Sequence, residues 1–141
     1  MTTSYSKQIR SIVKSEGNIE ISIVKVDKPI PADDEVLIEV HAAPINPSDI
    51  GLLLASANPK TLKKVKGDFP KVSMDIDKSH LPFFSKRVNK SLTVGNEGAG
   101  KVIDAGKDSK HLIGKIVSVS GGNTFSQYKC TDSFNCIEMK K

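Results

Sequence analysis

The chain has 141 residues, of which 38% are hydrophobic and 26% are charged, as is ordinary for a folded globular domain. A chain of this length can bury a core of its own without disulfides or a structural metal. It contains no apolar run of about 18 residues, which excludes a transmembrane helix, and its start lacks the apolar stretch of a signal peptide. We therefore expect one cytoplasmic domain over residues 1–141 that does not bind a membrane.

Charge is distributed unevenly along the sequence. The formal net charge is +5, from 21 Lys and Arg against 16 Asp and Glu, and much of the excess lies between Lys60 and Lys90. A basic face can attract nucleic acid, but here the lysines alternate with aspartates, and no series of aromatic residues lies among them. We expect a solvated basic surface, or one that attracts an anionic ligand such as a cofactor phosphate or a CoA ester, and no nucleic-acid binding.

The N-terminal part of the chain is predicted to be β-structure. Segments 9–14 and 19–26 are rich in Ile and Val, and Gly17-Asn18 between them favours a hairpin turn. Residues 35–43 have the strongest strand pattern, because side chains alternate between two faces. One of these faces is formed by Val36, Ile38 and Val40. A proline-rich break follows, and a short helix is expected from Pro47 to Leu54.

Residues 55–90 differ from the rest, because they are rich in lysine and are interrupted by three prolines. This pattern predicts short helices and loops. Leu81, Phe84 and Val88 recur at helical spacing, so an amphipathic helix is expected there, with these three side chains packed in the core.

After residue 92 the pattern of β-strands returns. Strands are predicted over segments that glycine-rich turns separate, namely 100–104, 114–119, 125–131 and 136–139. Seven or so short strands with such turns predict a mainly β fold with short helices, in the form of a partly open β-barrel.

Two cysteines, Cys130 and Cys136, lie six positions apart near the end of the chain. They form no C-x-x-C pair, and no histidine follows at the spacing of a zinc finger. We therefore expect two reduced thiols packed in the fold.

Three blocks of sequence occur in a characteristic order. Ile45-Asn46-Pro47-Ser48-Asp49 follows the strand at 35–40, Val94-Gly95-Asn96-Glu97-Gly98-Ala99-Gly100 comes some forty residues later, and the last block is Leu112-Ile113-Gly114-Lys115-Ile116-Val117. Together they resemble the N-terminal GroES-like domain of medium-chain dehydrogenases/reductases, and most of all the zinc-free quinone reductase and enoyl reductase branches. The resemblance implies a GroES-like, partly open β-barrel, with the Lys-rich segment at about 55–90 as an insertion.

In full-length members of this superfamily a Rossmann nucleotide-binding domain follows, and residues 1–141 lack it. We expect the chain to be a fragment or partial reading frame, or else a free-standing module. Gly98-Ala99-Gly100 begins like a dinucleotide-binding motif, but Ile103 stands in the place of its third glycine. We interpret these glycines as tight turns beside the substrate cleft. The isolated chain is expected to be inactive until a Rossmann domain, its own or that of another chain, supplies the cofactor.

Two asparagines indicate a protein without zinc. In the zinc-dependent branch of the superfamily a Cys ligand stands at the position of Asn46 and a His ligand at the position of Asn96. An amide is a poor zinc ligand beside thiolate and imidazole. Glu97 remains, but one carboxylate does not make a catalytic zinc site, so we expect no zinc.

The resemblance also implies roles for individual residues. Asn46 is expected beside the nicotinamide and the substrate, where its amide can donate to a carbonyl oxygen. Ser48 is expected to touch the substrate or to relay a proton. Asp49, Asn96 and Glu97 are expected to support them, with Asp49 paired to Asn96 across the cleft. For Ser48 and Asp49 the alternative is plain helix capping.

One departure concerns the proton donor. Enoyl reductases of this type resemble one another in a Tyr shortly after the N-P-S-D block, whereas this chain has tyrosines only at Tyr5 and Tyr128. The Lys-rich segment at about 55–90 occupies that neighbourhood instead. It is expected to lie at the mouth of the cleft, either as a lid or as surface decoration.

The sequence therefore predicts the substrate-side domain of an oxidoreductase that uses NADPH in a full-length context. Its small-molecule substrate would be an activated C=C, as in an enoyl thioester, or a quinone, and a homodimer is an open alternative to a monomer. The other hypothesis is a non-enzymatic GroES-like binding module that holds a partner with its cleft or its basic surface.

Overall fold

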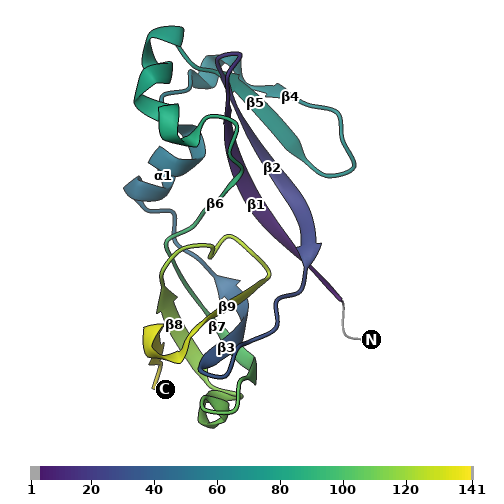
Figure 1. The fold of residues 1–141 in the computed structure, drawn as a ribbon, viewed down its shortest axis with the longest axis vertical. Coiled ribbons are helices and arrows are strands. Elements are labelled where there is room, and N and C mark those ends of the chain that lie inside the picture. Colours follow the sequence, from purple (N-terminus) through teal and green to yellow (C-terminus); the bar gives the residue numbers. More distant parts are fainter. Residues whose placement is uncertain (1–3, 141) are drawn as a thin grey trace. The chain divides into compact units, whose positions relative to one another are not determined.

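The computed structural model of the chain describes residues 4–140 and consists mainly of β-strands joined by short helices (Figure 1). The strands are β1 (Tyr5–Lys14), β2 (Asn18–Asp27), β3 (Glu35–Ala42), β4 (Lys63–Lys64), β5 (Lys71–Asp75), β6 (Leu92–Thr93), β7 (Glu97–Ala105), β8 (Ile116–Ser120), β9 (Tyr128–Asp132) and β10 (Cys136–Glu138). The α-helix is α1 (Pro47–Leu54), and the 3₁₀ helices are η1 (Pro59–Thr61), η2 (Lys78–Arg87), η3 (Lys110–Leu112) and η4 (Ser133–Asn135). Within residues 4–140, no helix is both long and apolar enough to cross a membrane.

The strands form two five-stranded sheets whose strand pairs are antiparallel. The strand order is β4-β5-β2-β1-β6 in one sheet and β10-β8-β7-β3-β9 in the other, and the sheets are not closed into a complete barrel. The predicted fold class, mainly β with short helices in a partly open arrangement, is therefore confirmed.

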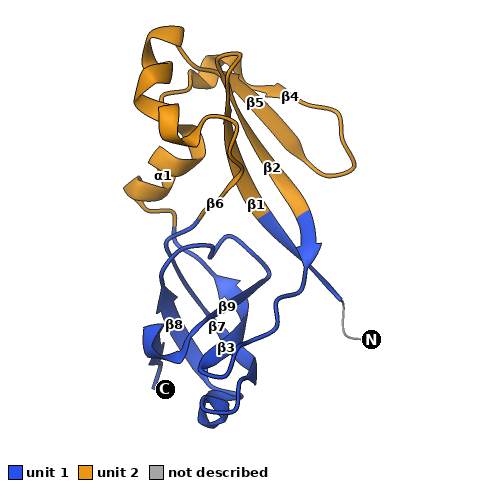
Figure 2. Ribbon diagram, viewed as in Figure 1, with its two compact units in different colours: residues 1–8, 25–44, 95–141 blue, residues 9–24, 45–94 orange. Residues whose placement is uncertain are grey.

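The chain divides into two compact units, and each has a hydrophobic core of its own (Figure 2). Unit 1 comprises residues 1–8, 25–44 and 95–141, and unit 2 comprises residues 9–24 and 45–94. The two long strands of the N-terminal hairpin, β1 and β2, contribute residues to both units.

Unit 1 is built around β3, which pairs with β7 on one side and β9 on the other. Pairing on both sides satisfies the backbone of this strand, and three consecutive side chains, Val36 to Ile38, are buried. Val36 and Ile38 are fully buried, and Val40 packs against the same cluster, which confirms the predicted inner face of this strand. The cluster is completed from β7 by Val102 and Ala105 and from β8 by Val117 and Val119.

Two glycines in β7 allow a close approach of β3. A Cβ on Gly100 would overlap the carbonyl oxygen of Glu39, and one on Gly98 would lie 3.1 Å from the carbonyl oxygen of Ala42. The pairing of β3 with β7 shifts register between Val40 and Ala42, beside these contacts. The interpretation of these glycines as tight turns was therefore wrong, because Gly98 and Gly100 lie within a strand, and at Gly100 a side chain has no room.

The core of unit 2 lies between its sheet and the helical segments that follow α1. Val13, Ile19, Met74 and Ile76 form it, and the next shell includes Leu54 and the predicted stripe of Leu81, Phe84 and Val88. The prediction that this stripe packs in the core is confirmed.

The Lys-rich segment 55–90 supplies part of this core. It contains the strands β4 and β5 as well as short helices, and β5 pairs with β2 in the middle of the sheet. Met74 and Ile76 are each only 4% exposed. The interpretation of this segment as surface decoration is therefore wrong, because unit 2 would lose half of its central core without it.

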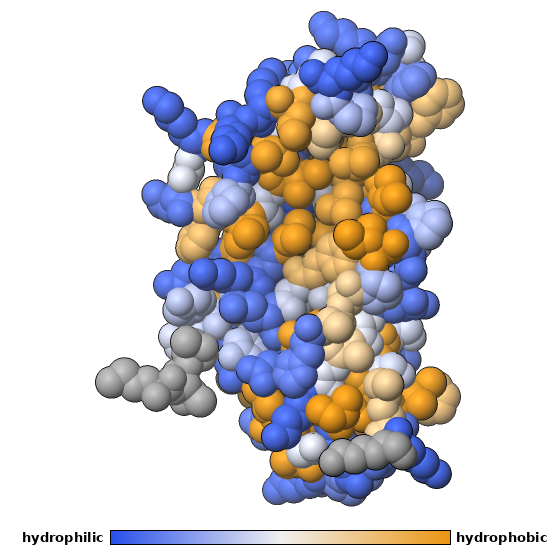
Figure 3. Space-filling view, turned by 180° about the vertical axis from the view of Figure 1, so that it is seen from behind, coloured by the Kyte–Doolittle hydropathy of each residue, from blue (hydrophilic) through white to orange (hydrophobic). Residues whose placement is uncertain are grey.

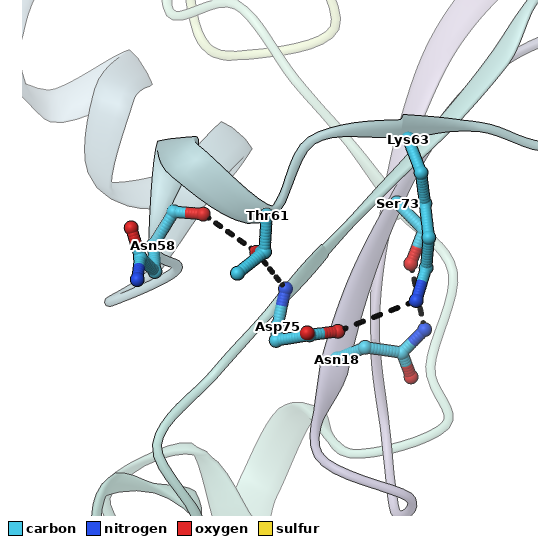
Figure 4. A network of polar contacts seen from close by, with 6 residues as sticks. All are labelled: Asn18, Asn58, Thr61, Lys63, Ser73 and Asp75. Atoms are coloured by element: carbon cyan, nitrogen blue, oxygen red, sulfur yellow. Dashed lines mark hydrogen bonds and ion pairs between the residues drawn. The ribbon is translucent and has the colours of Figure 1, made fainter.

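Polar contacts join β5 to the hairpin of β1 and β2 and to the start of the Lys-rich segment (Figure 4). Asn18 donates through Nδ2 to the Ser73 hydroxyl at 2.7 Å, and the backbone N–H of Asp75 donates to the Thr61 hydroxyl at 2.8 Å. The ammonium of Lys63 lies 3.5 Å from the Asp75 carboxylate. The first bond holds β5 beside β2 and the second joins β5 to η1, while the exposed ion pair adds little stability of its own.

Candidate functional site

The N-terminus of α1 carries the first group of predicted site residues. Asn46 is the residue before the helix, in an extended conformation with φ −87° and ψ 158°, and Pro47 occupies the first helical position. The backbone N–H of Asn46 donates to Oδ2 of Asp49 at 2.8 Å, and the backbone N–H of Asp49 donates back to the Asn46 carbonyl at 2.9 Å. Asp49 therefore caps the helix, and its expected supporting role at the site stays a prediction.

Asp49 is completely buried, which is unusual for a carboxylate. Its negative charge lies in the first turn, where the peptide dipoles of the helix stabilise an anion. Asn46 is half-buried and Ser48 is exposed on the same turn. The structure therefore brings Asn46, Ser48 and Asp49 together, with Asp49 holding the backbone of Asn46.

The second group of predicted residues lies in unit 1. Asn96 immediately precedes β7, and its carbonyl accepts from the N–H of Gly122 at 3.3 Å. Glu97, the first residue of β7, is exposed and lines a groove of about 460 Å³. Asp49 belongs to the other unit, so the expected pairing of Asp49 with Asn96 stays a prediction.

The groove at Glu97 combines polar groups with an apolar wall. Its polar side chains are Glu97, Ser118, Ser120 and Asn135. Ile137 and Met139 form part of the apolar wall and are 71% and 52% exposed. A concave surface of this size with a few polar groups is typical of small-molecule sites.

The cysteines are free thiols, both half-buried. Burial raises the pKa of Cys130 to about 11, and the nearby carboxylates of Glu35 and Asp104 act in the same direction. Burial also raises the pKa of Cys136. Within residues 4–140, no cluster of three or more His, Cys, Asp or Glu side chains could hold a metal ion.

Two basic residues with buried polar contacts were missed in the sequence. Lys129 in β9 is only 4% exposed and donates through Nζ to the carbonyls of Gly121 and Gly122. Burial lowers its pKa. The alternation of β9 was the available signal, because Lys129 and Thr131 share its inner face. Arg87, at the end of η2, is the second such residue and had no comparable signal.

Neither tyrosine lies in the segment shortly after the N-P-S-D block. Tyr5 lies in β1 and Tyr128 in β9, and the ammonium groups of Lys25 and Lys28 lie 4.1 Å and 4.2 Å from the centres of their rings. Both belong to unit 1, whereas α1 belongs to unit 2. The chain therefore offers no tyrosine from the segment in which the resemblance places a proton donor.

The net charge of the protein resides in unit 2. This unit contains 11 Lys and Arg against 6 Asp and Glu, a net charge of +5, whereas unit 1 contains 10 of each. Figure 3 shows apolar side chains gathered beside hydrophilic ones on one face of unit 2. Unit 2 also has a shallow groove, whose apolar lining is formed by Ile9, Ile21, Ile23, Pro70 and Val72. Lys64 and Lys66 are exposed in the neighbouring segment, which lines a second groove ending at Val72.

Comparison with known proteins identifies the class to which this fold and these motifs belong. The family model described as "Alcohol dehydrogenase GroES-like domain" matches residues 32–140. The chain therefore belongs to the alcohol dehydrogenase GroES-like domain family of the medium-chain dehydrogenase/reductase superfamily. No curated protein matches it at a significant level.

Solved structures with this fold include reductases of two kinds. A candidate NADPH:quinone reductase from Mesorhizobium loti is 22% identical with a TM-score of 0.60, over 99% of this chain and 38% of that one. The quinone oxidoreductase from Coxiella burnetii is 20% identical with a TM-score of 0.60, over 95% and 37%. A mutant form of enoyl thioester reductase from Candida tropicalis is 20% identical with a TM-score of 0.56, over 98% and 34%.

At these identities the likeness concerns the fold. This chain spans little more than a third of the length of the three proteins. The fold agrees with the family that the blocks around Asn46 and Asn96 indicated in the sequence.

Proposed function

We propose that the chain is the substrate-side domain of a zinc-independent, NAD(P)H-dependent reductase that acts on an activated C=C or a quinone. The observation that carries the proposal is the arrangement at the start of α1, where buried Asp49 holds the backbone of half-buried Asn46. The family match and the quinone and enoyl reductases among the proteins of the same fold support it.

Asn46 is the electrophilic group in this proposal. Reduction of an activated C=C puts negative charge on the oxygen of the conjugated carbonyl, and reduction of a quinone does the same. The side-chain amide of Asn46 can donate to that oxygen, and the N-terminal end of α1 adds the favourable field of its dipole. Because Asp49 fixes the backbone of Asn46, the donor is oriented before the substrate arrives.

In this proposal, Ser48 or water delivers the proton. The hydroxyl of Ser48 lies on the exposed side of the first turn of α1, within the same motif as Asn46. After hydride addition to an enoyl thioester, the enolate takes a proton at the α-carbon. A hydroxyl can relay this proton from water while Asn46 stabilises the enolate oxygen.

The cofactor requires a part beyond residues 4–140. When bound, the reduced nicotinamide supplies the hydride. The phosphates of the cofactor need a glycine-rich turn that leads from a parallel strand into a helix, whereas Gly98 and Gly100 lie inside an antiparallel strand. A Rossmann domain, in the same chain or in another one, would hold the cofactor while Asn46 faces its nicotinamide. The 141-residue chain alone is inactive in this proposal.

The substrate class can be tested on the protein that joins this chain to a nucleotide-binding domain. Loss of NADPH absorbance would be followed with crotonyl-CoA and, separately, with a soluble quinone. Turnover of one of them supports the proposal and assigns the class. Inactivity on both, with a protein that binds NADPH, contradicts it.

A second candidate function is a binding module for an anionic partner. The observation that favours it is the confinement of the whole net charge to unit 2, beside apolar grooves. Retention on a heparin column would test it, because the polyanion probes exposed positive charge. The double variant Lys64→Glu/Lys66→Glu should elute at much lower salt than Lys101→Glu/Lys110→Glu, which makes the same charge change in unit 1. Equal elution of the two variants contradicts this candidate.

A further inference from the structure

Arg87 links the end of the Lys-rich segment to α1. Its Nη2 donates to the carbonyl of Leu52 at 2.7 Å and to the hydroxyl of Ser11 at 3.1 Å, and its Nη1 donates to the carbonyl of Gly51 at 3.3 Å. Ser11 is completely buried and also donates to the Leu52 carbonyl, at 2.8 Å. One guanidinium therefore joins η2, α1 and β1 within unit 2.

The helix needs such a partner at this end. A helix of eight residues is marginal by itself, and the carbonyls of its last turn lack helical partners. The backbone N–H of Ala55 donates to the Gly51 carbonyl at 3.1 Å, but the Leu52 carbonyl accepts its hydrogen bonds from the side chains of Ser11 and Arg87. The last turn of α1 has no basic residue of its own. Arg87 therefore supplies the cation that complements the C-terminal end of the dipole.

The backbone that follows the helix is strained. Ala55 has φ +50°, in a region that residues with a side chain rarely adopt. Such a conformation persists where the surroundings impose it. Arg87 itself is half-buried, its Nε lies buried without a hydrogen-bond partner, and burial lowers its pKa. A desolvated guanidinium is retained only where its remaining bonds compensate.

We infer that Arg87 is a positioning residue, which through the carbonyls of Gly51 and Leu52 fixes α1 and so sets where Asn46 and Ser48 lie at its other end. The Lys-rich segment would then stabilise the position of α1 rather than act as a lid over the site. The importance of Asn46 and Ser48 rests on the proposed function, but the stabilisation of α1 by Arg87 does not. Asp49 fixes the N-terminal end of the same helix, so that opposite charges hold its two ends.

Amide hydrogen exchange of the 141-residue chain, followed by NMR, tests this link. Three variants are compared, namely Arg87→Met, Arg87→Lys and Lys86→Met, the last as a control at an exposed neighbouring position. In Arg87→Met the amides of Leu54 and Ala55 should exchange at least tenfold faster, because two charge-assisted bonds to the helix are lost. The amide of Ile76, which bonds to the Gly17 carbonyl at 2.8 Å, should change less than threefold.

Chemical shifts at the far end of α1 distinguish positioning from a local contact. The side-chain amide of Asn46 and the backbone amide of Ser48 should shift in Arg87→Met, shift less in Arg87→Lys, which keeps the charge, and stay in place in Lys86→Met. Unchanged exchange at Ala55, equal acceleration at Ile76, or unchanged shifts at Asn46 and Ser48 would each overturn the inference. Because no cofactor or substrate is used, inactivity on enoyl thioesters and quinones would leave this result intact.

Discussion

The two units of the molecule use the same kind of sheet for different purposes. Unit 1 is electrically balanced, with 10 basic and 10 acidic residues, and its strands approach so closely that glycines are required. Unit 2 carries the whole net charge and builds its core partly from a lysine-rich segment. The candidate site residues are divided between them, with Asn46, Ser48 and Asp49 in unit 2. A basic segment interrupted by prolines can therefore supply core structure, as Met74 and Ile76 do in unit 2.

The close approach of strands in unit 1 gives the largest expected effect. Gly100→Val should destabilise the protein by about 3 kcal/mol or more, because its Cβ would overlap the Glu39 carbonyl within paired backbone. Urea unfolding measures the change. The control Lys101→Val, at an exposed position of the same strand, should stay near wild type. A Gly100→Val protein as stable as that control would show that β3 and β7 do not approach as described.

The structural role of the Lys-rich segment predicts the next largest effect. Met74→Ala should cost about 2–4 kcal/mol, because Met74 is 4% exposed and packs with Val13 and Ile19. The exposed Leu62 of the same segment offers a matched control, and Leu62→Ala should cost less than about 0.5 kcal/mol. Similar losses from both variants would contradict the division of the segment into core and surface.

Much of this fold could be predicted from the sequence, and the failures have physical causes. The alternation of Val36, Ile38 and Val40 was sufficient for β3, because a half-apolar pattern of period two fits only a strand. β5 was missed because Lys71 and Asp75 at its ends resemble a loop, and only Ser73 and Met74 between them are buried. Local composition does not reveal which polar strand a neighbouring hairpin will pair with.

The candidate site could be predicted only in part. The motif around Asn46 gave the helix, its first residue and the capping carboxylate of Asp49, because capping depends on residues that are close in sequence. Arg87 lies 35 positions from Leu52 in the sequence. Nothing in the local sequence pattern indicates that the one arginine of the Lys-rich segment bonds to so distant a carbonyl. The pairing of Asp49 with Asn96 stays a prediction.

The half-buried thiols of unit 1 offer a chemical test of its packing. Alkylation of Cys130 by iodoacetamide at pH 8 should be on the order of tenfold slower than that of a model thiol, because a raised pKa reduces the thiolate about 100-fold while the thiolate becomes more nucleophilic. The neutral thiol stabilises the fold below its ordinary pKa of 9.0, and this contribution is lost as the pH rises through about 11. A Cys136→Ser background isolates Cys130. Alkylation as fast as that of the model thiol would contradict the burial.

The smallest expected effect is an increase in stability from a substitution in unit 2. A Cβ on Gly51 would meet no other atom within 4 Å, so Gly51→Ala should stabilise the protein by about 0.5–1 kcal/mol by raising the helix propensity of α1. The same substitution at Gly121, where φ is +97°, should destabilise instead. Thermal unfolding of both variants measures the difference. A loss of stability from Gly51→Ala would show that α1 is not helical at this position.

The most direct test of the central claim compares two asparagines that both precede helices. Asn46→Ala and Asn58→Ala would be made in a protein that joins this chain to a nucleotide-binding domain, and kcat/KM would be measured with NADPH and the accepted substrate. Asn58 caps η1 by accepting from the N–H of Lys60 at 3.1 Å and lies outside the family motif. Asn46→Ala should lower kcat/KM about 100-fold, whereas Asn58→Ala should keep near wild-type activity. Wild-type turnover by a folded Asn46→Ala protein would contradict the role proposed for Asn46.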